Sequence, residues 1–331
     1  MPETAAVAAV RVDILRDDRA ALYEATSRRL RGDVKGLPTL WLYDERGSRL
    51  YEEITRLPEY YLPRREGEIL RAHATAIAAR TQARTLVELG AGSGMNTRHL
   101  LDALERIGTL ERFVPFDVSE QVLRASAHAV ADSYPRMSVH ALVGDFERDL
   151  AALPSAGHRL IAFLGSTIGN LDPAQRESFL GTVAVSVGDD DAFLVGLDLV
   201  KDIARVEAAY NDAAGVTEAF VRNALTAVNR ELGATFEQRR YTYDARWDPE
   251  HERMDIGLRA REAHAVSIER LALDVAFEEG EPLRVEISSK FRHEQFGLEV
   301  DRVGLRLESW WTDRDGDFAV ALLLRNAAHE T

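Results

Sequence analysis

Between residues 64 and 200, short apolar runs alternate with segments of helical length. The runs that predict strands lie at residues 85–89, 113–117, 137–145, 160–165 and 192–198. Strands that alternate with helices are typical of βαβ units, which build parallel sheets. The pattern therefore predicts an α/β protein whose core is a doubly wound, mostly parallel sheet.

The polar positions between these runs predict where helices begin. Helices are predicted over residues 17–32 and 204–232, and from residues 64, 97, 119 and 172 onward. The signal at Asp172 is detailed, because Asp can cap a helix, Pro173 suits the first turn and Gln175 occupies the third position. The first 15 or so residues are rich in Ala and Val without clear periodicity, and they predict a loosely held end.

The last third of the chain follows another pattern. Residues 234–287 contain several β-like runs, and a helix is expected from His293. Two apolar runs at 305–311 and 317–324 are separated only by the tight turn at 313–317, so they must form an antiparallel pair. An antiparallel last strand on a parallel sheet is typical of S-adenosylmethionine-dependent methyltransferases, and a nicotinamide dehydrogenase does not need it.

Composition narrows the class of protein. The 331 residues are 46% apolar and 29% charged, as in an ordinary soluble globular protein, and 41 basic against 55 acidic residues give a net charge of −14. Without a dense basic cluster, nucleic acid is not an expected partner. The chain has no cysteine, no long apolar window and no signal-peptide pattern, so we expect a cytoplasmic protein without a membrane partner.

The segment T-L-V-E-L-G-A-G-S-G at residues 85–94 carries the first chemical signal. An apolar strand that ends in alternating glycines lets a ligand approach the backbone where a Cβ would block it. Gly90, Gly92 and Gly94 do not fit the dinucleotide pattern G-x-G-x-x-G, because Met95 stands where the third glycine belongs. The spacing favours S-adenosylmethionine over a dinucleotide.

Two further strand ends carry acids. Asp117 ends the next predicted strand and is placed to accept hydrogen bonds from ribose hydroxyls, and Asp145 ends the third, followed by Phe146, which could cover an adenine ring. Ligands of open α/β sheets bind at the carboxyl ends of the strands. The alternative for both acids is that they cap the helices that follow.

Longer segments make a family resemblance specific. The blocks L-Y-E-E-I-T-R-L-P-E-Y-Y (50–61), F-L-G-S-T-I-G-N-L (163–171), A-Y-N-D-A-A-G-V-T-E-A-F (209–220) and V-E-I-S-S-K-F (285–291) span almost the whole chain. With the glycine loop, they resemble the histidine-specific Nα-methyltransferases of ergothioneine biosynthesis. The resemblance implies a class I methyltransferase fold with a second, α+β substrate-binding domain, and trimethylation of L-histidine to hercynine with S-adenosylmethionine and no metal.

The resemblance also implies roles for individual residues. It places Tyr60 and Asn170 at the amino group as the catalytic pair, Tyr210 at the carboxylate, Glu286 and Ser288 at the imidazole, and Tyr43 over the pocket. On the cofactor side it implies Gly90, Gly92, Asp117, Asp145 and Phe146. The site is expected between a core of residues 64–200 and 289–331 and a recognition domain of residues 1–63 and 201–288.

The chain departs from the family pattern at two places. Asn96 stands where a lysine is usual; its amide can still donate to the cofactor carboxylate, so altered affinity is expected more than altered chemistry. Ile256 stands where a methionine near the substrate side chain is familiar, and it bears on how strictly histidine is selected.

The residue types suit this chemistry. Tyr60 and Asn170 are neutral and can follow an amine through successive methylations, so positioning is the main demand and no strong base is required. Glu286 and Ser288, two apart on a strand, share a face and can pair both imidazole nitrogens. By residue pattern alone, Glu286 could be a solvated surface acid, Tyr60 and Tyr210 packing residues and Asn170 a turn residue.

The leading hypothesis is thus a histidine Nα-methyltransferase, with L-histidine as the small-molecule substrate and a monomer as the working state. A related enzyme for another amino acid, such as tryptophan, is the nearest alternative. A protein with this fold that has lost catalysis is a further one, and a nicotinamide oxidoreductase is disfavoured by the glycine spacing. The nine histidines show no metal-binding spacing, so no metal is expected.

Overall fold

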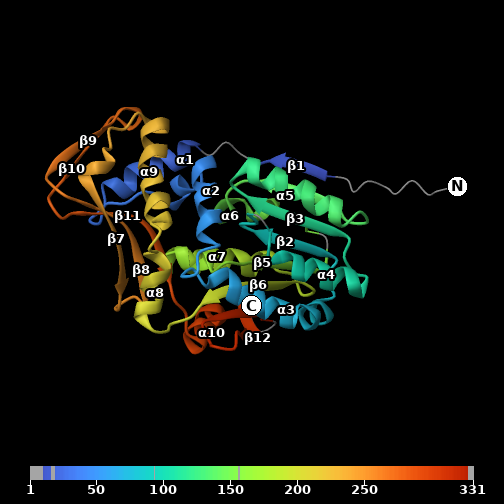
Figure 1. The fold of residues 1–331 in the computed structure, drawn as a ribbon. Helices are drawn as coiled ribbons and strands as arrows, with labels where there is room; N and C mark the ends of the chain where they lie inside the picture. Colours follow the sequence, from blue (N-terminus) through green and yellow to red (C-terminus); the bar gives the residue numbers. More distant parts are fainter. Residues whose placement is uncertain (1–9, 16–18, 93, 156, 327–331) are drawn as a thin grey trace. The chain divides into compact units, whose positions relative to one another are not determined.

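The chain divides into two compact units in a computed structural model that describes residues 10–15, 19–92, 94–155 and 157–326. The sheet unit comprises Met1–Arg16, Leu62–Val200 and Lys290–Thr331, and the insert unit comprises Asp17–Tyr61 and Lys201–Ser289 (Figure 1). Residues 10–15 group with the sheet unit, whereas the sequence analysis grouped them with the recognition domain.

An eight-stranded sheet forms the centre of the sheet unit, in the order β1-β4-β3-β2-β5-β6-β13-β12. The strands are β1 (Val10–Ile14), β2 (Thr85–Leu89), β3 (Arg112–Asp117), β4 (Ser138–Val143), β5 (Arg159–Phe163), β6 (Ala192–Asp198), β12 (Leu305–Thr312) and β13 (Phe318–Arg325). β1 to β6 pair in parallel, whereas β13 is antiparallel to both β6 and β12. This is the class I methyltransferase fold that the sequence predicted.

Helices connect these strands. They are α3 (Leu62–Thr81), α4 (Thr97–Ile107), α5 (Glu120–Ser133), α6 (Phe146–Asp149), α7 (Pro173–Ser186) and α10 (His293–Arg302), with 3-10 turns η2 (Leu150–Ala152) and η3 (Thr167–Asn170). The predicted start of α7 is confirmed: the Asp172 carboxylate accepts from Gln175 N at 2.9 Å, and the Gln175 side chain accepts from Asp172 N at 3.2 Å.

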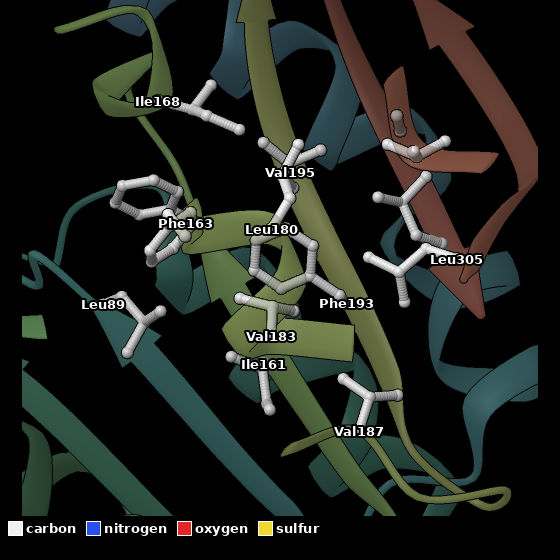
Figure 2. Close-up of a cluster of buried hydrophobic side chains, with 14 of the residues drawn as sticks. Leu89, Ile161, Phe163, Ile168, Leu180, Val183, Val187, Phe193, Val195 and Leu305 are labelled. Carbon is white, nitrogen blue, oxygen red and sulfur yellow. The ribbon is translucent and has the colours of Figure 1, made fainter. Parts of the chain in front are cut away.

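Apolar packing against α7 holds the centre of the sheet in place. Phe163 of β5 and Phe193 of β6 are fully buried, and Leu180 and Val183 of α7 join the same cluster (Figure 2). Burying such side chains contributes about 1.5–3 kcal/mol each. The strands are therefore fixed against the helix layer, and their carboxyl ends have a defined position for the loops that follow.

The expectation of a loosely held N-terminal end is wrong for residues 10–14. They form β1, which pairs in parallel with β4 at the edge of the sheet. A side-chain contact supports the pairing, since Asp13 Oδ2 lies 2.9 Å from His140 Nε2. Residues 1–9 lie outside the described part of the chain.

The insert unit combines helices with two small antiparallel sheets. Its helices are α1 (Arg19–Leu30), α2 (Glu45–Ile54), α8 (Ile203–Tyr210) and α9 (Val216–Leu232), with 3-10 turns η1 (Thr39–Leu42), η4 (Gln238–Arg240) and η5 (Glu269–Leu271). Its strands are β7 (Tyr241–Asp248), β8 (Arg253–Ala260), β9 (His264–Ile268), β10 (Leu273–Phe277) and β11 (Pro282–Ser289), paired as β11-β8-β7 and β10-β9.

The single helix expected over 204–232 is in fact two. Asp212 interrupts it, because its carboxylate accepts from the backbone N–H groups of Val216 and Thr217, both at 2.9 Å, and so starts α9. Gly215 takes a left-handed conformation at the break, with φ of 72°. Within the described ranges, no helix is long and apolar enough to cross a membrane.

Candidate functional site

The glycine loop follows β2 at the carboxyl edge of the sheet. Gly90, Gly92 and Gly94 all have positive φ, of 70°, 46° and 62°, which side chains with a Cβ rarely adopt. A Cβ added at Gly92 would meet no heavy atom within 4 Å, so the backbone there borders open space. The three glycines thus have the backbone conformation that the alternating pattern requires, and a ligand could approach the backbone at Gly92.

Asp117 at the end of β3 holds this loop. One carboxylate oxygen accepts from Gly92 N and the other from Ser119 N, both at 2.9 Å. Burial raises the pKa of Asp117, while these backbone donors lower it. The backbone N–H of Val118 is a third donor to this carboxylate, and a carboxylate has about four acceptor sites, so Asp117 can brace the loop and still accept one further hydrogen bond.

Asp145 and Phe146 lie at the end of β4. The Asp145 side chain accepts from Glu147 N at 2.9 Å and caps α6, which is the alternative that the sequence left open. The Phe146 ring is half-buried, packs edge-on against Phe163 at 5.0 Å between centroids, and lies 3.9 Å from a Cβ added at Gly90. It thus presents an aromatic face beside the loop.

Two buried acids stand behind the loop. Glu66 of α3 and Glu88 of β2 are 2% and 4% exposed. Burial raises the pKa of Glu66 to about 7 and that of Glu88 to about 8, and the negative charges of Glu66 and Asp117 also raise the latter. Glu88 Oε1 accepts from the Thr97 hydroxyl, and Oε2 has no hydrogen-bond partner among the described residues.

Asn96 is hydrogen-bonded to the first of these acids, Glu66. Its amide nitrogen donates to Glu66 Oε2 at 2.9 Å and to the carbonyl of Pro63 at 3.0 Å. Because both neighbours are acceptors, the nitrogen must face them, and its two hydrogens are spent within the chain. The predicted donation from Asn96 to a cofactor carboxylate remains a prediction, and in this conformation the amide offers only its oxygen.

Asn170 ends η3, which follows β5. The turn before it is strained, since Ser166 is a non-glycine residue with φ of 58° and adjoins Gly165 with φ of 73°. Ser166 Oγ accepts from Asp198 N at 2.9 Å, which stabilises this conformation. Strained backbone concentrates at functional sites, and here it directs the segment that carries Asn170.

The insert unit brings together the predicted aromatic residues. The ring centroids of Tyr60 and Tyr210 lie 6.1 Å apart, those of Tyr43 and Tyr51 5.8 Å, and those of Tyr51 and Tyr60 6.5 Å, all edge-on. Phe220 completes the group, 5.6 Å from Tyr43 and 6.0 Å from Tyr51. These five residues form what we term the aromatic cluster.

Polar groups line one side of this cluster. Ser288 Oγ lies 2.7 Å from the Tyr210 hydroxyl, and both side chains are buried. Glu286 precedes Ser288 by two positions on β11, so the two share a face. Ile256 of β8 is paired directly with Glu286 and is 1% exposed, which places the departing residue beside the predicted imidazole contact.

The Tyr60 hydroxyl is strongly perturbed by its surroundings. Burial raises the pKa of Tyr60 well above its usual value, and the neighbouring Tyr51, Tyr210 and Glu286 raise it further. The phenol therefore stays protonated at neutral pH, which makes it a hydrogen-bonding group and not an anionic base.

Comparison of the sequence with known proteins identifies a family. The profile of the family described as histidine-specific, S-adenosylmethionine-dependent methyltransferase matches residues 22–325. The chain is 47% identical to the histidine N-alpha-methyltransferase of Mycolicibacterium smegmatis over 310 residues, covering 94% of each chain, and 48% identical to that of Mycobacterium tuberculosis over 288 residues, covering 87% of this chain and 90% of the other. The chain belongs to this family of histidine-specific methyltransferases.

A longer fungal protein is similar to this chain over part of its length. The ergothioneine biosynthesis protein 1 of Neurospora crassa is 32% identical over 281 residues, which are 83% of this chain and 32% of that protein. The family is one of S-adenosylmethionine-dependent enzymes, and the glycine loop, with open space beside Gly92 and a buried acid behind it, is suited to that molecule.

Three residues of this family member were not predicted from the sequence. Glu66 looks like an ordinary helix-surface acid, and Ser166 follows a strand without any marked pattern. Tyr51 lies in the block L-Y-E-E-I-T-R, and its spacing from Tyr43 and Tyr60 was the available signal. The burial of Glu66, the positive φ of Ser166 and the ring contacts of Tyr51 mark these residues in the structure.

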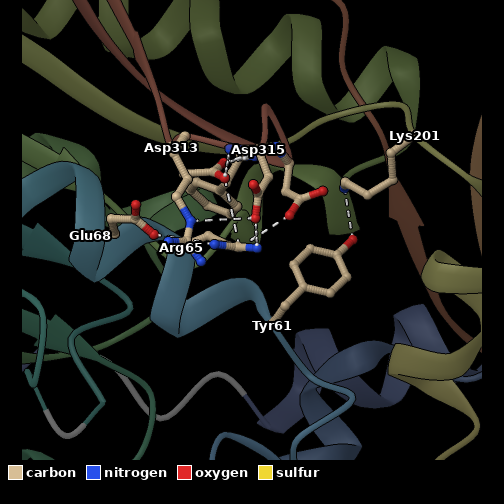
Figure 3. A network of polar contacts seen from close by, with 9 residues as sticks. Tyr61, Arg65, Glu68, Lys201, Asp313 and Asp315 are labelled. Carbon is tan, nitrogen blue, oxygen red and sulfur yellow. Dashed lines mark hydrogen bonds and ion pairs between the residues drawn. The ribbon is translucent and has the colours of Figure 1, made fainter.

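A group of acids in this family member could be mistaken for a metal site. Ligand atoms of Asp313, Asp315 and Asp317 lie within 4.8 Å of one another in the turn before β13. The Arg65 guanidinium pairs with all three, with Arg65 Nε 3.1 Å from Asp317 Oδ2 and 3.7 Å from Asp313 Oδ2 (Figure 3). The arginine provides the positive charge that such a group requires.

Proposed function

We propose that this chain transfers methyl groups from S-adenosylmethionine to the α-amine of L-histidine, three times, to give hercynine in ergothioneine biosynthesis. One observation carries the proposal beyond family membership: Glu286 and Ser288 share a face of β11, and Ser288 hydrogen-bonds to Tyr210 of the aromatic cluster. A carboxylate and a hydroxyl side by side suit an imidazole, which offers a donor and an acceptor on separate nitrogens.

The insert unit is, in this proposal, the amino-acid recognition domain. Glu286 accepts from one imidazole nitrogen and Ser288 serves the other. Tyr210 binds the carboxylate and Tyr43 covers the pocket. A site that pairs both nitrogens rejects phenylalanine and leucine, because buried polar groups would be left without partners.

The sheet unit holds the methyl donor in this proposal. The backbone of Gly90 and Gly92 leaves room for the molecule, Asp117 and Asp145 accept from ribose hydroxyls, and Phe146 covers the adenine. S-adenosylmethionine, when bound, supplies an activated methyl group on a sulfonium. The remaining task of the protein is to orient a neutral amine lone pair.

Tyr60 and Asn170 carry this orienting role. A protonated phenol and a carboxamide are both neutral, so neither fixes the amine as a cation by ion pairing. The faces of the aromatic cluster then suit the fixed positive charge that the third transfer leaves on nitrogen, because aromatic rings attract quaternary ammonium groups. The proton of each ammonium leaves to water at moderately alkaline pH, so no charged base is needed.

Mass spectrometry tests the proposal directly. Purified protein is incubated with S-adenosylmethionine and L-histidine, and products one, two and three methyl groups heavier are followed with time. Accumulation of the trimethylated product is the expected result. If S-adenosylmethionine binds but histidine gains no methyl group, the assignment of the substrate is refuted.

Ile256 favours one second candidate, a methyltransferase for another amino acid such as tryptophan. A β-branched residue next to Glu286 changes the shape of the predicted side-chain pocket without removing its polar groups. A panel of free amino acids, assayed for methyl incorporation at equal concentration, separates the two candidates. Preference for an indole would replace histidine in the proposal.

We also propose that the enzyme works as a cytoplasmic monomer on small molecules, without metal or nucleic acid. The net charge of −14 disfavours a nucleic-acid partner. Size-exclusion chromatography with light scattering, and activity after treatment with a chelator, test the oligomeric state and the metal separately.

A further inference from the structure

One buried carboxylate of the sheet unit contacts both the segment after the glycine loop and the segment that leads to Asn170. Glu66 Oε1 accepts from Gly165 N at 2.7 Å, and Glu66 Oε2 accepts from Asn96 Nδ2 at 2.9 Å. Gly165 leads into η3 and Asn170, whereas Asn96 follows the glycine loop and precedes α4. A single side chain on α3 thus binds both the cofactor loop and the segment of the predicted amine contact.

Two glycines make room for this arrangement. A Cβ added at Gly196 of β6 would lie 2.2 Å from Glu66 Oε1, and one added at Gly67 would lie 2.8 Å from Asn96 Oδ1. Real Cβ atoms essentially never approach so closely, so either side chain would displace a partner of the contact. The surroundings are therefore shaped around Glu66 and Asn96.

We propose that Glu66 is a positioning residue for methyl transfer, which holds the glycine loop, through Asn96, at a fixed spacing from Asn170. The proposal rests on the proposed function for the role of Asn170. Misplacing reacting groups by about 1 Å can cost roughly 100-fold in rate, so a rigid brace between donor and acceptor segments has a direct effect on turnover.

Only an ionised carboxylate can fill this role. Both partners of Glu66 are N–H donors. The amide of Asn96 cannot flip, because its oxygen would then face two acceptors, Glu66 Oε2 and the carbonyl oxygen of Pro63. The amide of a glutamine puts a donor opposite one of the two donors, and a protonated acid offers one of them only a hydroxyl oxygen, a weaker acceptor than a carboxylate oxygen. The ionisable group that faces it from β2 is Glu88, and the negative charge of Glu66 raises the pKa of Glu88.

Glu66→Gln is the first test, because it keeps the size of the side chain and removes one acceptor. Since a lost hydrogen bond to a charged group is worth roughly tenfold or more, we expect kcat to fall at least about tenfold and the S-adenosylmethionine Kd to weaken by about three- to tenfold, with the histidine KM within about twofold. Glu68→Gln is the matched control on α3, since Glu68 is half-exposed and pairs with Arg65.

The pH profile adds a readout that a purely structural role would not move. Burial raises the pKa of Glu66 to about 7, so the wild-type brace weakens as the pH falls through this value. The ratio of wild-type to Glu66→Gln kcat should therefore decline below about pH 7, because the acidic limb due to Glu66 is absent from the variant. A ratio independent of pH contradicts the proposal.

Gly67→Ala is a second test that removes no polar group. Alanine favours a helix over glycine by about 1 kcal/mol, but here its Cβ displaces Asn96. We expect an unchanged or higher unfolding temperature together with a loss of kcat of about fivefold or more. Gly181→Ala in α7 is the matched control, because a Cβ there meets no heavy atom within 4 Å.

The outcomes separate this inference from the proposed function. If wild-type protein leaves histidine unmethylated, the substrate assignment fails, while S-adenosylmethionine affinity in Glu66→Gln and Gly67→Ala still tests the loop contact. Unchanged kcat and cofactor Kd in both variants overturn the positioning role. The positioning role is also overturned if Glu66→Gln lowers only the unfolding temperature and Gly67→Ala keeps full activity.

Discussion

At the scale of single residues, the proposed site places a charged side chain, Glu286, at the imidazole and two neutral side chains, Tyr60 and Asn170, at the amine. Glu286→Gln should therefore raise the histidine KM by about tenfold or more, since a hydrogen bond to a charged group contributes about 1.5–3 kcal/mol. Binding of S-adenosylmethionine should be unaffected, because the residues proposed to bind the cofactor belong to the sheet unit. Steady-state kinetics with histidine and calorimetry with S-adenosylmethionine measure the two effects.

The control for this substitution is Glu279→Gln, in the exposed turn before β11. It removes the same charge from the same unit and should leave both constants unchanged. An unaltered histidine KM in Glu286→Gln would remove Glu286 from the recognition role, whereas a rise in both variants would indicate a general effect of net charge.

Tyr51 allows the aromatic cluster to be tested as a cation site. Its ring lies between those of Tyr43 and Tyr60. Tyr51→Leu should slow the last methylation more than the first, because a cation–π contact of about 0.5–2 kcal/mol matters most once the nitrogen carries a fixed charge. Tyr51→Phe keeps the ring and serves as the control. Equal slowing of all three steps in Tyr51→Leu would argue against a cation contact.

Local patterns in the sequence pointed to the loop and strand-end residues of the proposed site, but not to the residues that brace them. The glycine loop and Asp117 were predictable because positive-φ positions and strand-end acids leave a local signature. Glu66 was not, since the run R-R-E-G-E presents Glu66 and Glu68 alike. Only the fold buries one of them and leaves the other half-exposed.

At the scale of elements, helix ends that obey capping rules should contribute measurable stability. Asp172→Ala removes the reciprocal bonds with Gln175 at the start of α7 and should cost about 0.5–2 kcal/mol in the free energy of unfolding. Urea unfolding followed by circular dichroism measures it. Glu177→Ala, exposed on the same helix, should stay within about 0.5 kcal/mol of wild type. Equal losses in both variants would mean that the cap contributes nothing specific.

Local signals also explain which elements the sequence analysis mistook. The break between α8 and α9 lies at N-D-A-A-G, where Asp212 stands four residues before α9 and Gly215 directly before it, so a turn signal of an acid and a glycine could have located it. β1 had no such signal. Its pairing with β4 brings residues 10–14 against residues 139–143, and a partner so distant in sequence leaves no mark on a local pattern.

At the scale of the whole molecule, the buried acids predict how stability depends on pH. Folding raises the pKa of Glu66 from 4.5 to about 7 and that of Glu88 from 4.5 to about 8. Between these values the folded protein binds more protons than the unfolded chain, so the free energy of unfolding falls as pH rises. Acids with a lowered pKa, such as Asp191 and Asp212, have their effect at lower pH.

The cofactor-free protein should therefore lose stability as pH rises from about 5 to about 8, and Glu88→Gln should lose less, because one of the two protons no longer leaves. The measurement is the urea midpoint at several pH values and constant ionic strength, with Glu177→Gln as the exposed control that should run parallel to wild type. The slope, not the level, is decisive, since the glutamine also alters the contact with Thr97. A Glu88→Gln curve parallel to wild type would mean that Glu88 ionises alike in the folded and unfolded states, and that its burial beside the glycine loop does not hold its proton.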